Sequence, residues 1–179
     1  MLASLALFGT ATWAEFLGQM AAERHFLEVE VAFSHRMPTV FAALRTLDAP
    51  LDLAYGAQVI SSALAIAAIV IVWRSPRSAD VKAATLVIAT FLATPHAWDY
   101  DEVALIFAAA WLWRDGVRTG FLPWERLAIV ALLVLPLPSI MVNVLTGIEP
   151  GPVVLWLVLV LLIRRPIDTP AAADAAPSS

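Results

Sequence analysis

The sequence predicts an all-α fold: a polytopic bundle of transmembrane helices with one amphipathic helix lying at the membrane interface. Of its 179 residues, 61% are hydrophobic and 15% are charged, whereas a soluble domain is about half apolar and a quarter charged. The excess lies in uncharged runs such as residues 53–73 and 127–148. At about 1.5 Å per residue, each run reaches roughly 30 Å, the thickness of the hydrocarbon core of a bilayer. The composition therefore excludes an ordinary soluble globule.

Charge and cysteine content exclude further classes. The net charge is −4 and no basic tract occurs, so we expect no nucleic-acid partner. The chain has no cysteine, which excludes disulfides, thiolate metal sites and thiol nucleophiles. It also has no glycine-rich phosphate loop, serine nucleophile elbow or histidine–glutamate zinc motif. The partner that the composition predicts is membrane lipid.

Residues 1–12 are apolar but too short to cross a bilayer. A signal peptide would begin with basic residues, and the first basic residue here is Arg24. We interpret this stretch as a partial transmembrane helix, which predicts that the chain is the carboxyl-terminal part of something longer. The alternative is a short native end lying on the membrane.

Residues 13–52 are predicted to form an interfacial segment on the outer face. Up to residue 31, acidic and amide side chains recur at helical spacing opposite apolar ones, which is typical of an amphipathic helix in the interface plane. Pro38 lies beyond this pattern and, because proline is favoured in a first helical turn, predicts a second short helix over residues 38–47. A turn containing Pro50 follows.

Residues 53–165 are predicted to form the transmembrane bundle. The apolar runs that form its spans are residues 53–73, 83–98, 103–113, 127–148 and 153–163. Pro136 and Pro138 would kink the fourth run, since a membrane helix tolerates the missing backbone donors of proline. The tail at residues 166–179 is rich in alanine, proline, serine and aspartate, which predicts disorder.

Positive charge predicts the orientation of these spans. Basic residues concentrate at residues 74–82, 114–126 and 164–165, whereas the turns at residues 99–102 and at Glu149 are acidic. Basic loops lie on the cytoplasmic side of a membrane. We therefore expect the basic loops and the carboxyl tail in the cytoplasm of a bacterial cell and the acidic turns outside its plasma membrane.

The acidic turn at residues 99–102 is predicted to line a site. One helix through residues 83–113 would place three carboxylates near the bilayer centre and Arg114 on the outer face, and both are costly. Two short spans that meet at the turn avoid this cost. Because both spans are short, we expect the turn to be recessed, within protein or a watery cavity.

The first candidate site is the start of the short helix, where His35, Arg36 and Thr39 are candidate ligands of a donor phosphate. A helix amino terminus offers free N–H groups and positive potential, and the side chains of Arg36 and His35 add further donors. The alternative is that Arg36 meets lipid headgroups and that His35 is an ordinary interfacial residue.

The second candidate site is the acidic turn, which would line a substrate pocket. Its candidate residues are His96, Asp99, Tyr100 and Asp101. Carboxylates beside aromatic rings suit a sugar, a divalent cation or the basic residues of the preceding segment. Metal ligation has weak support because adjacent carboxylates diverge, so no metal or other cofactor is predicted. Alternatively, Asp99 and Asp101 cap the following helix and pair with Arg36 or Arg45.

Three stretches resemble a known family. They are SHRMPTVFAALRTL at residues 34–47, YGAQ at 55–58 and LATPHAWDYDEV at 92–103. In this order and spacing they resemble the carboxyl-terminal portion of glycosyltransferase family 87, which is related to the mycobacterial polyprenol-phosphate-mannose-dependent mannosyltransferases. The similarity extends from Met1 to about Arg165. The residues that match its motifs in type are Arg36, Met37, Pro38, Thr39, Val40, Phe41, Thr94, Pro95, Asp99, Tyr100 and Asp101; His96 stands where tyrosine is usual.

The resemblance implies an integral membrane enzyme of the C superfamily of glycosyltransferases. Such enzymes transfer a hexose, often mannose, with inversion from a polyprenyl-phosphate sugar donor to an acceptor on the outer face, and an acidic residue of their first outer loop acts as base. No segment of this chain matches that loop, so its catalytic residues stay unassigned. We expect a truncated carboxyl-terminal part, with the missing amino-terminal half as a partner. The alternative is a non-enzymatic membrane protein, such as a transporter subunit or an inert fragment.

Overall fold

The structure is a computed structural model that describes residues 2–29, 36–137 and 139–166. Every regular element in these ranges is a helix, which confirms the all-α class. The helices fall into two units, Met1–Ser34 and His35–Ser179, which are described separately. The division into four segments stays a prediction, and His35, Pro138 and residues 167–179 of the tail lie outside the described residues.

The first unit contains α1 (Leu2–Val29), which is interrupted at Gly9. Gly9 has a φ of +75°, a conformation that glycine adopts without the steric cost of a Cβ atom. The sequence predicted a boundary at residues 12 and 13, whereas the helix breaks earlier, at this glycine. Leu7, Phe8 and Phe16 are exposed, so this unit does not bury its large apolar side chains by itself.

The second unit begins with the two predicted helices, although the first starts later than expected and Pro38 lies before its cap. The short helix α2 (Val40–Thr46) starts where Thr39 accepts a hydrogen bond from the Ala42 N–H, a typical N-cap. After Pro50, α3 (Leu51–Arg74) covers the first predicted span and ends at its basic flank. Within the described residues, α3 is the one helix that is long and apolar enough to cross a membrane by itself.

The middle of the chain forms two helices joined by a turn, as predicted. Helix α4 (Ala79–Ala93) is capped by Ser78, whose hydroxyl accepts from the Val81 N–H. The short 3-10 helix η2 (Asp99–Ala104) contains the acidic turn and leads into α5 (Leu105–Thr119). The predicted end of this helix at residue 113 is wrong. The helix continues because Asp115 is buried against its neighbours and pairs with Arg118 one turn further on.

The run at residues 127–148, predicted as one span kinked by Pro136 and Pro138, forms α6 (Glu125–Val134) and α7 (Ser139–Thr146), which are bent by 80°. Together the two helices are long and apolar enough for one broken span or for a re-entrant loop. Pro136 lies in the break, where its missing N–H cannot continue the hydrogen bonds of a helix. Helix α8 (Gly151–Arg164) follows, with Pro152 in its first turn, a position that proline favours.

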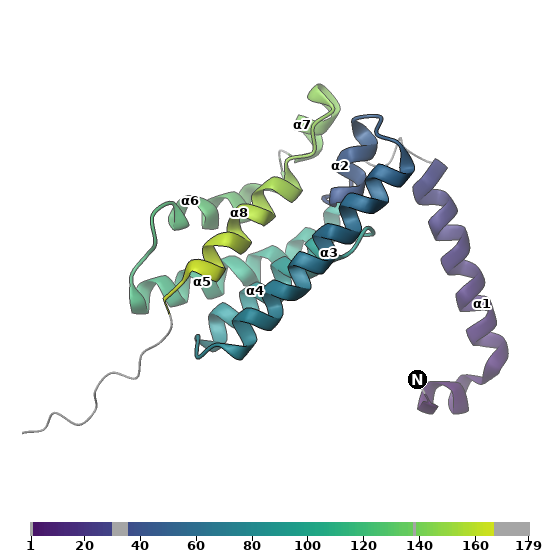
Figure 1. Cartoon of the computed structure of the whole chain (residues 1–179), viewed down its shortest axis with the longest axis horizontal. Helices are drawn as coiled ribbons and strands as arrows, with labels where there is room; N and C mark the ends of the chain where they lie inside the picture. The colour runs from purple at the N-terminus through teal and green to yellow at the C-terminus, as the bar shows by residue number, and fades with distance from the viewer. Residues whose placement is uncertain (1, 30–35, 138, 167–179) are drawn as a thin grey trace, which may run out of the picture. The chain divides into compact units, whose positions relative to one another are not determined.

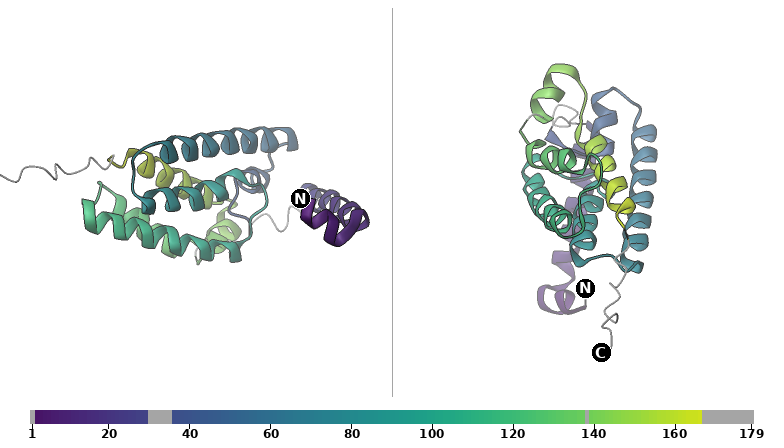
Figure 2. Two further views of the ribbon diagram at one scale, coloured as in Figure 1. Left: turned by 90° about the horizontal axis from the view of Figure 1, so that it is seen from below. Right: turned by 90° about the vertical axis from the view of Figure 1, so that its left-hand side faces the viewer.

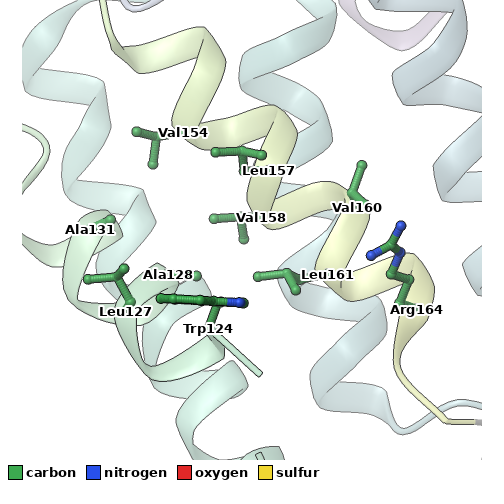
Figure 3. A pocket seen from close by; sticks show the side chains of 10 residues that line it. All are labelled: Trp124, Leu127, Ala128, Ala131, Val154, Leu157, Val158, Val160, Leu161 and Arg164. Atoms are coloured by element: carbon green, nitrogen blue, oxygen red, sulfur yellow. The ribbon is translucent and has the colours of Figure 1, made fainter. Parts of the chain in front are cut away.

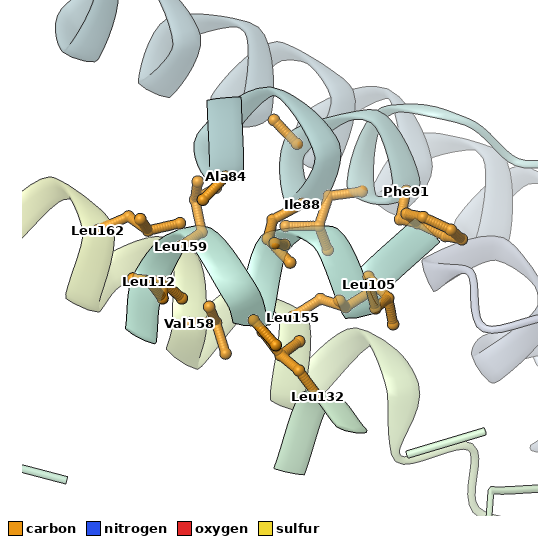
Figure 4. Packing of buried hydrophobic residues seen from close by; sticks show 14 of the residues in the cluster. Ala84, Ile88, Phe91, Leu105, Leu112, Leu132, Leu155, Val158, Leu159 and Leu162 are labelled. Carbon is orange, nitrogen blue, oxygen red and sulfur yellow. The ribbon is translucent and has the colours of Figure 1, made fainter. Parts of the chain in front are cut away.

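Helix α4 is the centre of the second unit. It contacts α3, α5 and α8, while α3 lies along the outside of the group (Figure 1, Figure 2). Its apolar face packs into one continuous core with side chains of α5, α6 and α8 (Figure 4). The labelled members of this core are Ala84, Ile88, Phe91, Leu105, Leu112, Leu132, Leu155, Val158, Leu159 and Leu162. With small residues of α3 included, this core joins α3, α4, α5, α6 and α8.

A buried ionic cluster joins one end of this bundle. Arg165, just after α8, has a side chain that is 1% exposed and donates to both carboxylate oxygens of Glu125 at 2.7 and 2.6 Å. It also pairs with Asp115 of α5, which accepts a 2.6 Å hydrogen bond from Ser78. Arg114 pairs with Asp80 of α4 in the same region. The sequence placed these arginines in basic loops but did not reveal the buried carboxylates that hold them.

Candidate functional site

The three family-like stretches meet at the other end of the bundle, where Gln58 joins them. Its side-chain oxygen accepts from the Phe41 N–H at 3.0 Å, and its amide nitrogen donates to the Leu92 carbonyl at 3.1 Å. The ring of Tyr55 packs on that of Phe41, with centroids 4.7 Å apart. Gln58 is 3% exposed, so its amide connects α2, α3 and the end of α4 out of contact with solvent.

The end of α4 explains why polar groups are needed on α3 here. Pro95 cannot continue a helix, and the last carbonyls of a helix have no partner within it. Serines of α3 supply these partners: Ser61 donates to the Leu92 carbonyl at 2.8 Å and Ser62 to the Ala93 carbonyl at 2.7 Å. The turn that follows α4 is therefore anchored to α3 by side-chain hydrogen bonds.

Replacing Gln58 by leucine is expected to lower the free energy of unfolding by about 1–3 kcal/mol. The Phe41 N–H would lose its acceptor in a buried place, whereas the Leu92 carbonyl would keep Ser61. Denaturant unfolding of the purified protein in detergent, followed by tryptophan fluorescence, measures the change. The matched control is Gln19→Leu on the exposed surface of α1, and equal stability of the two variants would contradict the assignment.

Arg36 lies against Asp99 of the acidic turn. Its Nε and Nη2 atoms each donate to one carboxylate oxygen at 3.0 Å, which is the strong bidentate form of this pair. The hydrogen bond and the charge of Asp99 raise the pKa of the Arg36 guanidinium. The Arg36 side chain is 42% exposed, and its Nη1 makes no hydrogen bond to the described residues. The alternative in which Asp99 pairs with Arg36 is thus confirmed.

Aromatic side chains surround this ion pair. The Arg36 guanidinium lies 5.9 Å from the centre of the Trp98 ring, within the range of a cation–π contact. Trp98 Nε1 donates to His96 Nε2 at 3.2 Å, and the Trp98 and Tyr100 ring planes are within 8° of parallel. Asp101 accepts from the Trp98 N–H at 2.9 Å, which is the predicted cap of the following helix. All four candidate residues of the acidic turn therefore lie together with Arg36.

The predicted phosphate site at the start of α2 differs from expectation. The N–H groups of Phe41 and Ala42 already have acceptors in Gln58 and Thr39. The Thr39 hydroxyl is buried and also bonds the Pro95 carbonyl at 3.3 Å. These groups are not free to bind an anion, because the junction with α3 and α4 uses them. Of the three candidate phosphate ligands, His35 lies outside the described residues and Thr39 is engaged in the junction. Arg36 keeps one guanidinium nitrogen, Nη1, without a hydrogen bond to the described residues.

Two buried glutamates lie beside this site, and the sequence did not single them out as site residues. Glu102 of η2 is 1% exposed, and neither of its carboxylate oxygens has a hydrogen-bond donor among the described residues. Burial, reinforced by the charges of Glu149 and Asp99, raises the pKa of Glu102 to about 8. Burial also raises the pKa of Glu149 to about 7. Hydrogen bonds that Glu149 accepts from the Gly151 N–H and the Asn143 side-chain amide oppose this shift and lower the pKa in part.

The loop that carries Glu149 is packed directly on the family-like stretch. A Cβ atom on Gly151 would lie 2.8 Å from the Pro38 Cβ and 3.0 Å from a Glu149 carboxylate oxygen. Only glycine therefore allows Pro38 to approach the start of α8 so closely. No group of three or more histidine or acidic residues that could hold a metal ion occurs within the described ranges.

An apolar groove of about 430 Å³ lies between α6 and α8, away from the Arg36–Asp99 pair (Figure 3). Its lining is Trp124, Leu127, Ala128, Ala131, Val154, Leu157, Val158, Val160, Leu161 and Arg164. It offers one cation and no carboxylate, so it lacks the groups that acid–base chemistry on a sugar requires. We therefore take the junction around Arg36 and Asp99, and not this groove, as the candidate site.

Comparison with known protein families matches residues 1–95, more than half of the chain, to glycosyltransferase family 87. The chain belongs to glycosyltransferase family 87. Members of this family are membrane enzymes that transfer sugars. No curated protein and no solved structure matches the chain.

The family 87 match covers one side of the candidate site. It includes Arg36, Thr39 and Gln58 and ends at Pro95, before the acidic turn. The sequence motifs predicted that the similarity to family 87 extends to about Arg165. The family match ends at residue 95, and beyond it the similarity rests on the motif at residues 92–103 alone. The contacts of Arg36 with Asp99 and of Thr39 with Pro95 physically join the matched part to the acidic turn.

Proposed function

We propose that this family 87 glycosyltransferase moves a hexose, mannose in particular, from a polyprenyl-phosphate donor to an acceptor on the outer face of a membrane. The observation that carries the proposal is the junction of the family-like stretches around Gln58 and the Arg36–Asp99 pair. It brings a partly exposed guanidinium, carboxylates and aromatic rings together, at the end of the bundle opposite the buried ionic cluster around Arg165. The catalytic base stays unassigned.

The exposed surface of the second unit supports its insertion in a membrane as a polytopic bundle. Large apolar side chains face outward on several helices; examples are Val59 and Ile60 on α3, Phe107 on α5, Leu127 on α6, and Val153 and Leu157 on α8. A monomeric soluble protein rarely exposes so much contiguous apolar surface. We propose that lipid covers this surface. The buried ionic cluster around Arg165 would then lie on the cytoplasmic side and the Arg36–Asp99 junction on the outer side.

Arg36 is the proposed contact for the donor phosphate. Asp99 holds the guanidinium in one orientation through two hydrogen bonds and leaves Nη1 open. A cation held in place beforehand stabilises the charge that develops on a leaving phosphate without reorganising during the reaction. In this role Arg36 contacts the substrate, whereas Asp99 and the Trp98 ring are positioning groups. Thr39 supports the same geometry through the Pro95 carbonyl instead of binding phosphate itself.

Replacing Arg36 by alanine is expected to reduce sugar transfer about 100-fold, the usual effect of removing one preorganised electrostatic contact. Transfer of labelled hexose from polyprenyl-phosphate hexose is measured in membranes from cells that carry the gene and from cells in which it is deleted. The matched control is Arg24→Ala, because Arg24 is exposed on α1 and pairs there with Glu28. Small, equal losses in both variants would contradict the phosphate contact. Equal transfer by membranes with and without the gene would contradict the function itself and favour the non-enzymatic alternative.

A further inference from the structure

The apolar groove between α6 and α8 opens outward and carries an exposed cation at one end. Among the side chains of its lining, Leu127 is 60%, Leu157 is 62% and Trp124 is 78% exposed, so the groove is not closed into the core. Arg164 is exposed as well, and it makes no hydrogen bond or ion pair with the described residues. The other lining residues carry no charge. Arg164 is therefore the charged group of the lining that is available to an occupant.

Trp124 lies at the same end of the groove as Arg164 (Figure 3). Helix α6 begins directly after Trp124 and α8 ends at Arg164, and Arg165 donates to Glu125 across this end at 2.7 Å. The backbone of Trp124 has a φ of +68°, which a bulky residue rarely adopts. The Leu122 N–H fixes this turn by donating to the Glu125 carboxylate at 2.8 Å. Strained conformations of this kind cluster at ligand sites, and here the strain fixes an exposed indole at the end of the groove.

The charges around this end of the bundle favour an anionic occupant. The three carboxylates of the basic segments at residues 74–82 and 114–126 are buried and paired with arginines; they are Asp80, Asp115 and Glu125. Among the described residues of these segments, no carboxylate is left exposed. An ammonium headgroup would find no partner here, whereas a phosphate would find Arg164. The complementary headgroup is therefore one with a net negative charge.

The carboxyl end of α8 is made compatible with an anion by a second arginine. The last carbonyls of a helix carry partial negative charge, which would oppose a phosphate next to Arg164. Arg77 donates to the Ile163 carbonyl through Nη2 at 2.7 Å and to the Arg165 carbonyl through Nε at 3.1 Å. Its positive charge offsets that of the helix end. An anion bound to Arg164 therefore meets less repulsion from α8 than it would at an uncapped helix end.

The length of the groove matches the depth of one leaflet of a bilayer. Its lining on α8 extends from Val154 to Arg164, which corresponds to a rise of about 15 Å. The hydrocarbon core of a bilayer is about 30 Å thick, so one leaflet contributes about half of this depth. An acyl chain in the leaflet on the side of Arg164 would run the length of the groove. The donor phosphate is proposed at Arg36, at the opposite end of the bundle, so the donor would come from the other leaflet.

We propose that the apolar groove between α6 and α8 binds one acyl chain of an anionic phospholipid from the cytoplasmic leaflet, with the headgroup phosphate on Arg164. The Trp124 ring lies at the level of the headgroup, where an indole can keep its apolar body in lipid and its N–H in water. The acyl chain covers exposed side chains of the lining such as Leu127 and Leu157. This inference goes beyond sugar transfer and rests on the proposed insertion of the bundle in a membrane, with Arg164 on the cytoplasmic side.

Native mass spectrometry of the purified full chain measures which lipid the protein retains. Phosphatidylglycerol and phosphatidylcholine with the same acyl chains are added at equal concentration to the detergent micelles, and the bound copies of each lipid are compared. The unmodified protein should retain the anionic lipid about fivefold better, and Arg164→Met should abolish this preference, which is the usual effect of one cation near an anionic headgroup. The control Arg74→Met removes an exposed arginine at the end of α3 that does not line the groove, and it should keep the preference.

A second pair of variants tests the place of the acyl chain. Ala131→Phe puts a ring into the groove without changing its charge, so it should lower the retention of phosphatidylglycerol. Ala63→Phe adds the same ring to the exposed surface of α3 and should leave retention unchanged. A circular dichroism spectrum and a melting temperature for each variant identify loss of folding. Where Ala131→Phe fails to fold, Ala131→Leu fills part of the groove with a smaller side chain and should lower retention in the same direction.

Four results would overturn the proposal. They are equal retention of the two lipids by the unmodified protein, equal effects of Arg164→Met and Arg74→Met, equal retention by the Ala131 and Ala63 variants, and displacement of phosphatidylglycerol by added polyprenyl phosphate. The last result would assign the groove to the donor. Gene-dependent sugar transfer without a lipid preference rejects only the phospholipid site, and a lipid preference without gene-dependent sugar transfer rejects only the proposed enzymatic function.

Discussion

Replacing Arg165 by methionine is expected to lower the free energy of unfolding of the helical bundle by about 3–5 kcal/mol. The guanidinium is 1% exposed and lies between the carboxylates of Asp115 and Glu125. Without it, two negative charges remain buried beside each other, and each has lost its strongest partner. Methionine keeps the length and apolar stem of the side chain, so the loss reports the charge and not a cavity. Denaturant unfolding in detergent, followed by tryptophan fluorescence, gives the difference.

The neighbouring arginine supplies the control for this experiment. Arg164 is exposed and lines the apolar groove between α6 and α8, so Arg164→Met should change the free energy of unfolding by less than 0.5 kcal/mol, as is usual for a surface site. A loss in Arg165→Met no larger than in Arg164→Met would show that the ionic cluster is not buried in the folded protein. Arg165→Lys should fall between the two, because an ammonium group keeps the charge but cannot reproduce the bidentate contact with Glu125.

The contrast between these two arginines shows what the sequence could not predict. Both belong to one basic pair, and the charge rule for membrane proteins assigns the pair to one side without separating its members. Burial of Arg165 depends on carboxylates 40 and 50 residues away, and no local pattern marks Asp115 or Glu125 as buried. The same limit explains the wrong end of α5. A basic segment was taken for a loop, although its charges are held on a helix by partners from other elements.

The candidate site was predictable only in part. Pro38 predicted a short helix over residues 38–47, but Thr39 caps this helix and Pro38 lies before it. The span predicted over residues 83–98 ends at Ala93, because Pro95 cannot continue a helix. The meeting of Arg36 with Asp99, 63 residues away, was one of two alternatives, since opposite charges on the outer side were expected to pair. The hydrogen bond from the Phe41 N–H to Gln58 was not predictable, because a glutamine within an apolar helix has no unique partner in sequence. This bond and the one from the Ala42 N–H to Thr39 occupy two of the N–H groups that were expected to bind an anion at the start of α2.

Between pH 5 and pH 8, the unmodified protein is expected to lose stability through Glu102. In the folded state the pKa of this carboxyl is raised from 4.5 to about 8, chiefly by burial, while in the unfolded chain it returns to its usual value. The folded state therefore binds the proton more tightly. The stabilisation is complete below about pH 4.5, declines as the pH rises and is lost above about pH 8. A shift of this size corresponds to a loss on the order of 5 kcal/mol.

Glu102→Gln should remove the part of the pH dependence that Glu102 causes and leave the part that Glu149 causes, because glutamine resembles the neutral acid in shape and does not ionise. We expect the variant to be more stable than the unmodified protein at pH 8 and the difference to shrink toward pH 5. Unfolding in detergent at several pH values, followed by tryptophan fluorescence, measures both curves. Glu15→Gln makes the same chemical change on the exposed surface of α1 and should leave the curve of the unmodified protein unchanged. If stability declined between pH 5 and pH 8 as steeply in Glu102→Gln as in the unmodified protein, the decline would have to come from another group.

A second substitution isolates one of the three causes of the pKa shift in Glu102. Burial and the charge of Asp99 do not depend on Glu149, whereas the charge of Glu149 acts only while Glu149 is ionised. Glu149→Gln should therefore move the stability transition of Glu102 to lower pH without abolishing it. It also removes the titration of Glu149 itself, whose pKa burial raises to about 7, so the total decline becomes smaller. If Glu149→Gln left the transition in place, the two carboxyls would be uncoupled, and the packing of Pro38 on Gly151 would not bring the loop of Glu149 close to the acidic turn.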